Sequence, residues 1–307
     1  MTKVLNESYW GPIDSNVDWC EPNYVYTQYV AEFFNTMSSI PISLFALLGI
    51  VYARRYASTE IRYTLAYSAV VIVGLGSVLF HGTLRRWAQA CDELPMLYSV
   101  YTLTYITHDN QYMLPRNNVS FNNTKLTIEK LQHKLWLKLA LFGAAVMETT
   151  IYYMYEDLYI LFFISFVGAV IYLISTTHHT ITNPATLVVQ YDSNHNTNDR
   201  LIHHKLYYNK YVDFHNTRYL FNYAVLCYGI ASTFWLSEIA LCSYLPQWAY
   251  FHAMWHLFSG AATYLSIQAQ LSWRASLYDR IHHVYYLLYC IPYVSIEPVQ
   301  LDHISID

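Results

Sequence analysis

The chain has 307 residues, of which 55% are hydrophobic and only 12% are charged, and its formal net charge is −4. An ordinary soluble domain carries about 25% charged residues, so this composition excludes a typical soluble domain and leaves an unusually large core or a chain embedded in lipid. Nucleic acid is not expected as a partner of this weakly charged chain.

Seven apolar runs are each long enough to cross a bilayer, which takes about 20 mostly apolar helical residues. They cover residues 33–53, 63–84, 91–109, 136–154, 157–176, 219–240 and 248–270. A helix at the surface of a soluble protein has a polar face, whereas these runs are apolar nearly all round. The sequence therefore predicts an all-α integral membrane bundle of seven transmembrane helices, with residues 33–270 as its membrane domain.

The distribution of lysine and arginine predicts the orientation of the bundle, because cytosolic loops carry an excess of both. Lys3, Arg85 and Arg86 lie on one side, with the N-terminus, and the other 14 of the 17 lie on the opposite side. We therefore expect residues 1–32 to form a luminal N-terminal segment and residues 271–307 a cytosolic tail. On the luminal side, Asn6 begins the glycosylation motif Asn-Glu-Ser.

The luminal segment carries oxygen-bearing side chains at close spacing, namely Asp18, Glu21, Asn23 and Glu32. Hard oxygen ligands of this kind suit calcium, although the pattern is not that of an EF-hand. A solvated acidic segment is the alternative. Because Glu32 lies at the start of the first run, a cation bound there would attach the segment to the bundle.

Polar residues within the apolar runs are candidate functional groups, because such residues are costly in a membrane. Ser77 and His81 share one face of the second run, His252 and His256 share one face of the seventh, and Asp92 opens the third. In the predicted orientation, the second run ends at the luminal side. The third and seventh runs begin at that side. We therefore expect these groups to meet at one membrane level.

Three neutral histidines with an open fourth position are typical of a catalytic zinc site, where zinc lowers the pKa of its bound water to about 7. A nearby carboxylate can move the proton of that water, and a serine can stabilise an oxyanion. The set predicts hydrolysis of an amide or ester held in the bilayer. Alternatively, the histidines hold haem or hydrogen-bond across the bundle, and the serine only packs helices.

Two glutamates in the apolar runs and two luminal cysteines are further ionisable residues of interest. Glu238 lies near the luminal end of the sixth run, where it can reach water, and Glu148 has no assigned role. Among the five cysteines, Cys20 and Cys242 both fall on the luminal side, where disulfides form. A bridge between them and two free thiols are both open at this point.

Four motifs, in order along the chain, resemble those of the alkaline ceramidase family of seven-span membrane amidases. They are YWGPIDSNVDWCEPNYVYTQYVAEFFNTMSS, SVLFHGTL, DELPMLY and FHAMWH, which lie between Tyr9 and about Gly260. The wider superfamily, which includes the adiponectin and progestin receptors, shares the placement of the Ser/His pair, the Asp and the HxxxH motif. The DWCE and DELPM segments indicate the ceramidase branch.

The resemblance implies a zinc-dependent hydrolase that cleaves the amide of a ceramide, such as phyto- or dihydroceramide, in the membrane of the endoplasmic reticulum or Golgi. It implies that residues 33–270 are the catalytic domain, with zinc on His81, His252 and His256. It implies that Ser77 and Asp92 act in catalysis. A seven-span zinc-containing receptor and a haem-binding membrane oxidoreductase are the alternatives.

The same resemblance extends to the luminal segment. It fits a disulfide between Cys20 and Cys242. It also implies a calcium ion with these ligands: Asp18, the backbone carbonyl of Trp19, Glu21, Asn23 and Glu32.

Overall fold

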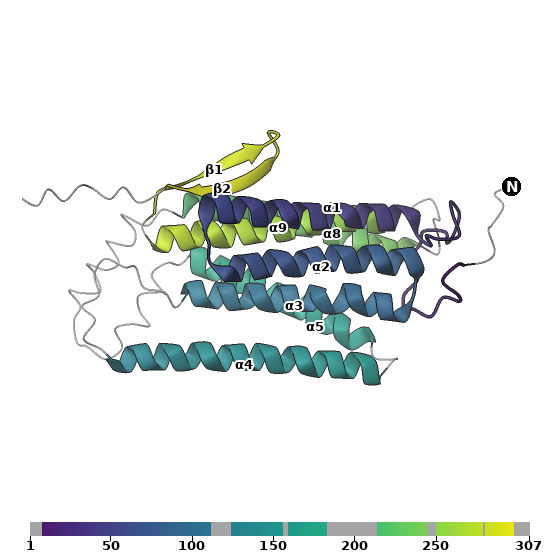
Figure 1. The fold of residues 1–307 in the computed structure, drawn as a ribbon, viewed down its shortest axis with the longest axis horizontal. Coiled ribbons are helices and arrows are strands. Elements are labelled where there is room, and N and C mark those ends of the chain that lie inside the picture. Colours follow the sequence, from purple (N-terminus) through teal and green to yellow (C-terminus); the bar gives the residue numbers. More distant parts are fainter. Residues whose placement is uncertain are drawn as a thin grey trace, which may run out of the picture.

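The computed structural model describes residues 8–111, 124–155, 159–182, 214–242, 244, 250–278 and 280–297. Asn6, the predicted glycosylation site, lies outside the described residues. The described residues form seven α-helices and one two-stranded sheet (Figure 1). The helices are α1 (Phe33–Tyr52), α2 (Ile61–Thr83), α3 (Arg86–Gln111), α4 (Thr124–Met154), α5 (Tyr159–Thr182), α8 (His215–Leu241) and α9 (Phe251–Leu277). A π-helical turn, η1 (Ala53–Ala57), extends α1.

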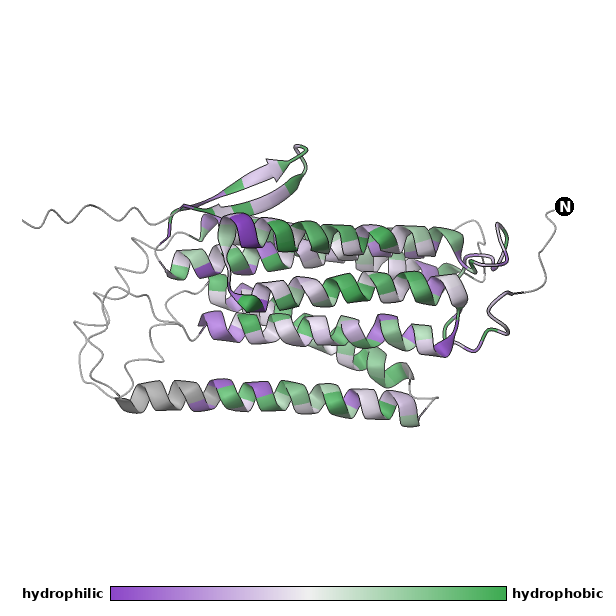
Figure 2. Ribbon diagram, in the orientation of Figure 1, coloured by the Kyte–Doolittle hydropathy of each residue, from purple (hydrophilic) through white to green (hydrophobic). Residues whose placement is uncertain are grey.

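The helices bury many polar side chains together with an apolar core, and they expose many large apolar side chains, which a soluble protein rarely does. In α1, Asn35 and Ser39 are buried, whereas Leu44 and Leu47 on the same helix are about half exposed. Figure 2 shows that apolar residues follow most of the length of α1 and α2. Because exposed rows of large apolar side chains require an apolar surrounding, these helices face lipid.

Five of the seven described helices are long and apolar enough to cross a membrane. They lie at Phe33–Ala57, Ile61–Thr83, Lys134–Met154, Ile160–Thr182 and His215–Leu241. Buried polar residues such as Asp92 in α3 and Gln268 in α9 lower the hydropathy of the other two. The chain is therefore a helical multi-pass membrane protein, and membrane crossing by α3 and α9 stays a prediction.

Helix α9 lies at the centre of the bundle and packs against α8, α1, α2 and α3. Buried residues occur from His252 to Leu277, so the helix continues past the predicted end of the seventh run at residue 270. Helix α4 lies outermost and packs mainly against α3 (Figure 1). Helix α9 thus runs through the centre of the protein and contributes buried side chains at both ends of the bundle.

The C-terminal segment contains an antiparallel hairpin that the sequence did not predict, formed by β1 (His282–Leu287) and β2 (Ile291–Ile296). Val294, 1% exposed, packs into the core between α1 and α9. Its backbone N–H donates to the side-chain oxygen of Gln268, and the hydroxyl of Tyr264 donates to the carbonyl of Pro292, both at 2.9 Å. The expected tail is therefore partly folded onto the helices.

Candidate metal centre

Three histidines from two helices meet at the end of the bundle that carries the N-terminal segment. His81 lies in the last turn of α2, and His252 and His256 lie one turn apart at the start of α9. All three are buried, and their nearest ligand atoms all lie within 4.8 Å of one another. Within the described part of the chain, this is the one set of three or more His, Cys, Asp or Glu side chains that converges in this way.

Hydrogen bonds on the outer side of two rings orient them toward a common centre. Nδ1 of His81 lies 2.5 Å from Oε2 of Glu32, which can only accept as a carboxylate. Nδ1 of His256 lies 2.9 Å from the hydroxyl of Ser38, whose own proton goes to the carbonyl of Asn35 at 3.0 Å. Both Nδ1 atoms therefore donate, and both Nε2 atoms keep a free lone pair.

One of these Nε2 atoms is buried without any hydrogen-bond partner. His81 is fully buried, and its Nε2 has no partner among the described residues. A buried polar atom without a partner is costly, and a metal-ligating histidine characteristically donates its other N–H to a carboxylate or another acceptor. The residues present therefore fit a metal ion held by three imidazoles.

Ser77 and Asp92 lie beside this centre because α2 and α3 are in very close contact there. A Cβ on Gly76 would be only 1.9 Å from the carbonyl oxygen of Cys91, so only glycine allows this approach. The hydroxyl of Ser77 lies 3.5 Å from Nε2 of His256 and interacts with the carboxyl group of Asp92. The structure thus places both residues next to the histidines, and their role in catalysis stays a prediction.

The predicted calcium ligands surround the start of α1. Both carboxylate oxygens of Glu21 accept backbone N–H groups of the first helical turn, from Phe34 at 2.7 Å and Asn35 at 2.9 Å. Oε1 of Glu32 accepts the N–H of Trp19 at 3.0 Å. These carboxylates attach the N-terminal segment to the helix.

The remaining two side chains contact each other, because Nδ2 of Asn23 donates to Asp18 at 2.9 Å. The Oδ1 atom of Asn23 is buried without a hydrogen-bond partner among the described residues, as expected of a ligand oxygen. However, the carboxylates of Asp18, Glu21 and Glu32 do not converge as closely as the histidines do. The donors have the chemistry that calcium requires, and an ion would have to draw them together.

Cys20 and Cys242 form a disulfide, with their Cα atoms 5.5 Å apart. The bond joins the N-terminal segment to the end of α8 across 222 residues of sequence. Of the two possibilities left open by the sequence, the bridge is the one that the structure contains. It closes the N-terminal segment over the histidine centre.

Several contacts of the histidines were not predicted from the sequence. The indole of Trp19 stacks on the ring of His252, with ring centroids 3.8 Å apart and planes at 23°. Glu238 is 1% exposed, so the prediction that it reaches water is wrong. Ser38 gave no sequence signal, because a serine in a membrane helix more often packs against its neighbours.

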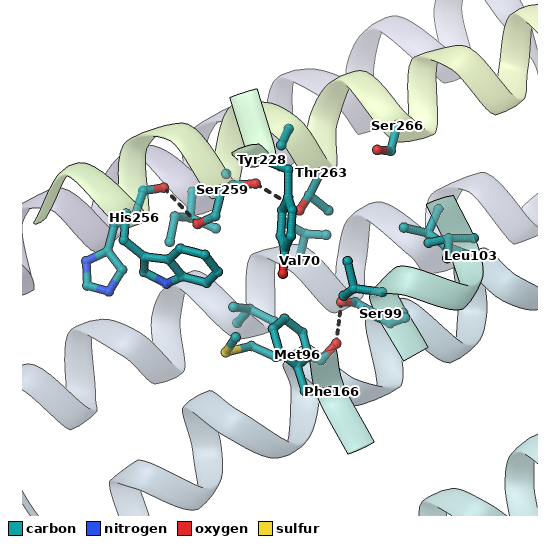
Figure 3. Close-up of a pocket in the computed structure, with 18 of the residues that line it drawn as sticks. Val70, Met96, Ser99, Leu103, Phe166, Tyr228, His256, Ser259, Thr263 and Ser266 are labelled. Atoms are coloured by element: carbon teal, nitrogen blue, oxygen red, sulfur yellow. Dashed lines mark hydrogen bonds between the residues drawn. The ribbon is translucent and has the colours of Figure 1, made fainter. Parts of the chain in front are cut away.

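A cavity of about 150 Å³ leads away from the histidines into the bundle. Ser77, Asp92 and His256 line one end, and Gln270 lines the other, about 21 Å further along α9 at 1.5 Å per residue. Figure 3 shows Phe166 and other apolar side chains beside this part of the bundle. Most residues that line the cavity are apolar, whereas the histidines, Ser77 and Asp92 place polar groups at one end.

Comparison with known proteins identifies relatives over nearly the whole chain. The family model described as ceramidase matches residues 11–295. An alkaline ceramidase of Arabidopsis thaliana is 27% identical over 293 residues, which cover 94% of this chain and 96% of the relative. A putative alkaline ceramidase of Dictyostelium discoideum, dcd3A, is 28% identical, covering 87% of this chain and 89% of the relative.

A third relative is more similar over a shorter stretch. Alkaline ceramidase 3 of Mus musculus is 45% identical over 102 residues, which cover 33% of this chain and 38% of the relative. The family match spans the N-terminal segment, the histidine centre and the hairpin, so it includes every part of the candidate site. The chain belongs to the ceramidase family.

Proposed function

We propose that this protein is an alkaline ceramidase, a membrane hydrolase that cleaves the amide bond of a ceramide into a sphingoid base and a free fatty acid. The observation that carries this proposal is the convergence of His81, His252 and His256 with Ser77 and Asp92 at one end of an apolar cavity. Membership in the ceramidase family supports the choice of substrate.

The metal proposed for the three imidazoles is zinc, which commonly binds three histidines in hydrolases and keeps a fourth position open. When bound, zinc supplies a Lewis acid and lowers the pKa of a water molecule to about 7. Glu32 and Ser38 would hold the rings of His81 and His256 in the orientation that the ion requires. The contacts that these rings already make are the support for this assignment.

The protein groups that move protons are Asp92 and Ser77. Asp92 takes a proton from the attacking water as the oxygen adds to the amide carbonyl carbon. Ser77 donates a hydrogen bond to the carbonyl oxygen as this oxygen becomes negative. Asp92 then delivers the proton to the nitrogen, the C–N bond breaks, and the amine and the carboxylic acid separate.

A ceramide-type lipid would enter from the bilayer, with phyto- and dihydroceramide as the proposed substrates. The cavity would hold an aliphatic chain, and its polar end would place the amide beside Ser77 and Asp92. Burying one methylene contributes about 0.8 kcal/mol. Chain length would therefore affect binding even where the catalytic groups are unchanged.

The proposed membrane arrangement has seven crossings, with the N-terminus in the lumen and the C-terminus in the cytosol. Helices α3 and α9 have 26 and 27 residues and lie alongside α1 and α2, which supports their crossing with the others (Figure 1). A disulfide at the end with the histidines supports a luminal position for that end. The proposed location is the membrane of the endoplasmic reticulum or Golgi.

Calcium is proposed as a second ion, bound by Asp18, the backbone carbonyl of Trp19, Glu21, Asn23 and Glu32. The buried Oδ1 of Asn23 and the two buried glutamates support it, because a cation offsets the cost of burying carboxylates. Glu32 also contacts His81. A calcium ion there would therefore stabilise the carboxylate that orients a zinc ligand.

The decisive experiment combines metal analysis of the purified protein with hydrolysis of a ceramide panel. We expect one zinc per chain and release of sphingoid base and fatty acid in equal amounts. Zinc without turnover on any ceramide would instead favour a receptor. A Soret absorption band in place of zinc would favour a haem protein and overturn the proposal.

A further inference from the structure

Glu238 has a buried carboxylate that the proposed reaction does not use. It lies in the last turn of α8 and is 1% exposed. Its Oε1 accepts the backbone N–H of Cys20 at 3.0 Å. Its Oε2 has no hydrogen-bond partner among the described residues, which is costly for a buried carboxylate and calls for a partner.

Nδ1 of His252 lies 3.9 Å from Oε2, and the backbone N–H of the same residue also interacts with the Glu238 carboxylate. This Nδ1 is likewise buried without a hydrogen-bond partner among the described residues. The gap exceeds a hydrogen bond by about 1 Å, so a direct hydrogen bond between them requires the Glu238 side chain to move closer to the ring. Trp19 stacks on the face of the same ring, so the imidazole is held in its plane while its Nδ1 edge faces Glu238.

The arrangement around His252 repeats the one around His81. Trp19 and Cys20 are consecutive residues, and their backbone N–H groups donate to Glu32 and Glu238 at 3.0 Å each. The other oxygen of Glu32 contacts Nδ1 of His81, and the other oxygen of Glu238 faces Nδ1 of His252. Each carboxylate therefore lies between one amide of the N-terminal segment and one histidine of the centre.

We propose that Glu238 is a positioning residue that orients His252 for metal binding. Its Oε2 accepts the Nδ1 proton, which leaves the lone pair on Nε2 for the ion. This inference rests on the proposed zinc site. Its physical basis is that a carboxylate behind a ligating histidine fixes the tautomer and increases the basicity of the ligand, and that its loss typically weakens metal binding by 10–100-fold.

The Cys20–Cys242 disulfide helps to hold Glu238 in place beside His252. Cys242 follows Glu238 by one helical turn, and its partner Cys20 supplies the amide that Glu238 accepts. The covalent bond and the hydrogen bond therefore hold the same two segments together, and Glu238 has one oxygen left for His252.

The variant Glu238→Gln separates a positioning role from a purely structural one. A glutamine has the same shape and can still accept the Cys20 amide through its single oxygen. Its NH₂ group then faces His252 as a donor, which places the imidazole proton on the wrong nitrogen. A structural role therefore predicts unchanged zinc affinity, whereas a positioning role predicts a loss.

The measurement is the zinc dissociation constant of the purified full-length protein, by competition with a chromogenic chelator. We expect Glu238→Gln to weaken zinc binding by roughly 10–100-fold, with little change in the thermal unfolding of the metal-free protein. The matched control is Glu148→Gln, because Glu148 contacts Ser165 at 2.6 Å and none of the histidines. We expect this control to bind zinc as tightly as the wild type.

A second variant covers the case in which Glu238→Gln is recovered poorly. Glu238→Asp keeps both acceptor oxygens but shortens the side chain by one methylene, and we expect zinc affinity between those of the wild type and Glu238→Gln. Wild-type affinity in either folded variant would overturn the positioning role while leaving the zinc centre in place. A wild-type protein that binds no zinc would overturn both the proposed function and this inference.

Discussion

The two ends of the helix bundle both contain buried ionisable groups, but carboxylates pair with Arg and Lys side chains at only one of them. At the end opposite the histidines, Asp109 contacts Lys134 at 2.5 Å and Arg274 at 3.2 Å, and Glu60 contacts Arg274 at 3.0 Å. Arg62 contacts both carboxylates. At the histidine end, by contrast, buried atoms of His81, His252 and Glu238 have no hydrogen-bond partner among the described residues.

This difference distinguishes a structural cluster from a binding site. Compensated charges join helix ends, and removing one of them leaves its partners unpaired. Groups that are buried without compensation persist only when something else, such as a ligand, completes them. The predictions below therefore expect substitutions at the histidine end to abolish metal binding or catalysis, and those at the opposite end to reduce stability.

The largest effect is expected from His81→Ala. Loss of this imidazole removes one of three proposed zinc ligands and leaves the Glu32 carboxylate buried without its partner. We expect zinc content and ceramide hydrolysis both to fall to background, as measured by metal analysis and by product release. A variant that keeps stoichiometric zinc would show that the ion binds elsewhere.

Asp92→Asn tests the proton transfer while preserving the metal. The substitution removes the proposed base beside Ser77 but none of the three imidazoles. We expect zinc content to be unchanged and kcat to fall by roughly 10²–10⁴-fold, the usual contribution of a general acid–base group. Turnover at the wild-type rate would exclude Asp92 as the base.

Ser77→Ala should have a smaller effect, because it removes one hydrogen-bond donor and leaves the ligands and Asp92 in place. Loss of an oxyanion donor costs roughly 10²–10³-fold in kcat. We expect this loss in steady-state hydrolysis of a ceramide, with wild-type zinc content as the control. A loss below about tenfold would limit Ser77 to packing α2 against α1 through its 2.9 Å contact with Ser39.

The meeting of the histidines with Ser77 and Asp92 could be predicted from the sequence, but the contacts of Trp19, Ser38 and Glu238 with the rings could not. Spacing places His252 and His256 on one face, and the topology places His81 at the same depth. Glu238 lies at the end of an apolar run, where a carboxylate is expected to reach water. It is buried, and Cys20 of the N-terminal segment, which is bonded to Cys242 at the end of α8, contacts it.

The C-terminal hairpin escaped prediction for a different reason. The loop between the strands has three residues, because Leu287 pairs with Ile291. Hairpin positions with a positive φ usually carry Gly, Asn or Asp. Here Leu288 and Tyr289 occupy these positions, with φ of 49° and 62°. The turn therefore has no sequence signal, and packing of Val294 against the helices overrides the local preference.

At the opposite end of the bundle, Asp109→Asn should reduce stability without affecting the metal. The change leaves Arg62, Lys134 and Arg274 without the carboxylate that they share. Breaking a buried ion pair costs about 3–5 kcal/mol, so we expect a clear fall in the thermal unfolding midpoint. Zinc content per folded chain should stay at the wild-type level, and a loss of zinc would contradict the distinction between the two ends.

The smallest effect is expected from removal of calcium, because the disulfide and the carboxylates of Glu21 and Glu32 hold the N-terminal segment without it. With a chelator selective for calcium over zinc, we expect a modest fall in both hydrolysis and the unfolding midpoint, restored by added calcium. Asn23→Ala should abolish the response, since it removes the buried oxygen that has no other partner. If calcium changes neither activity nor stability in the wild type, the segment is fixed by its protein contacts alone.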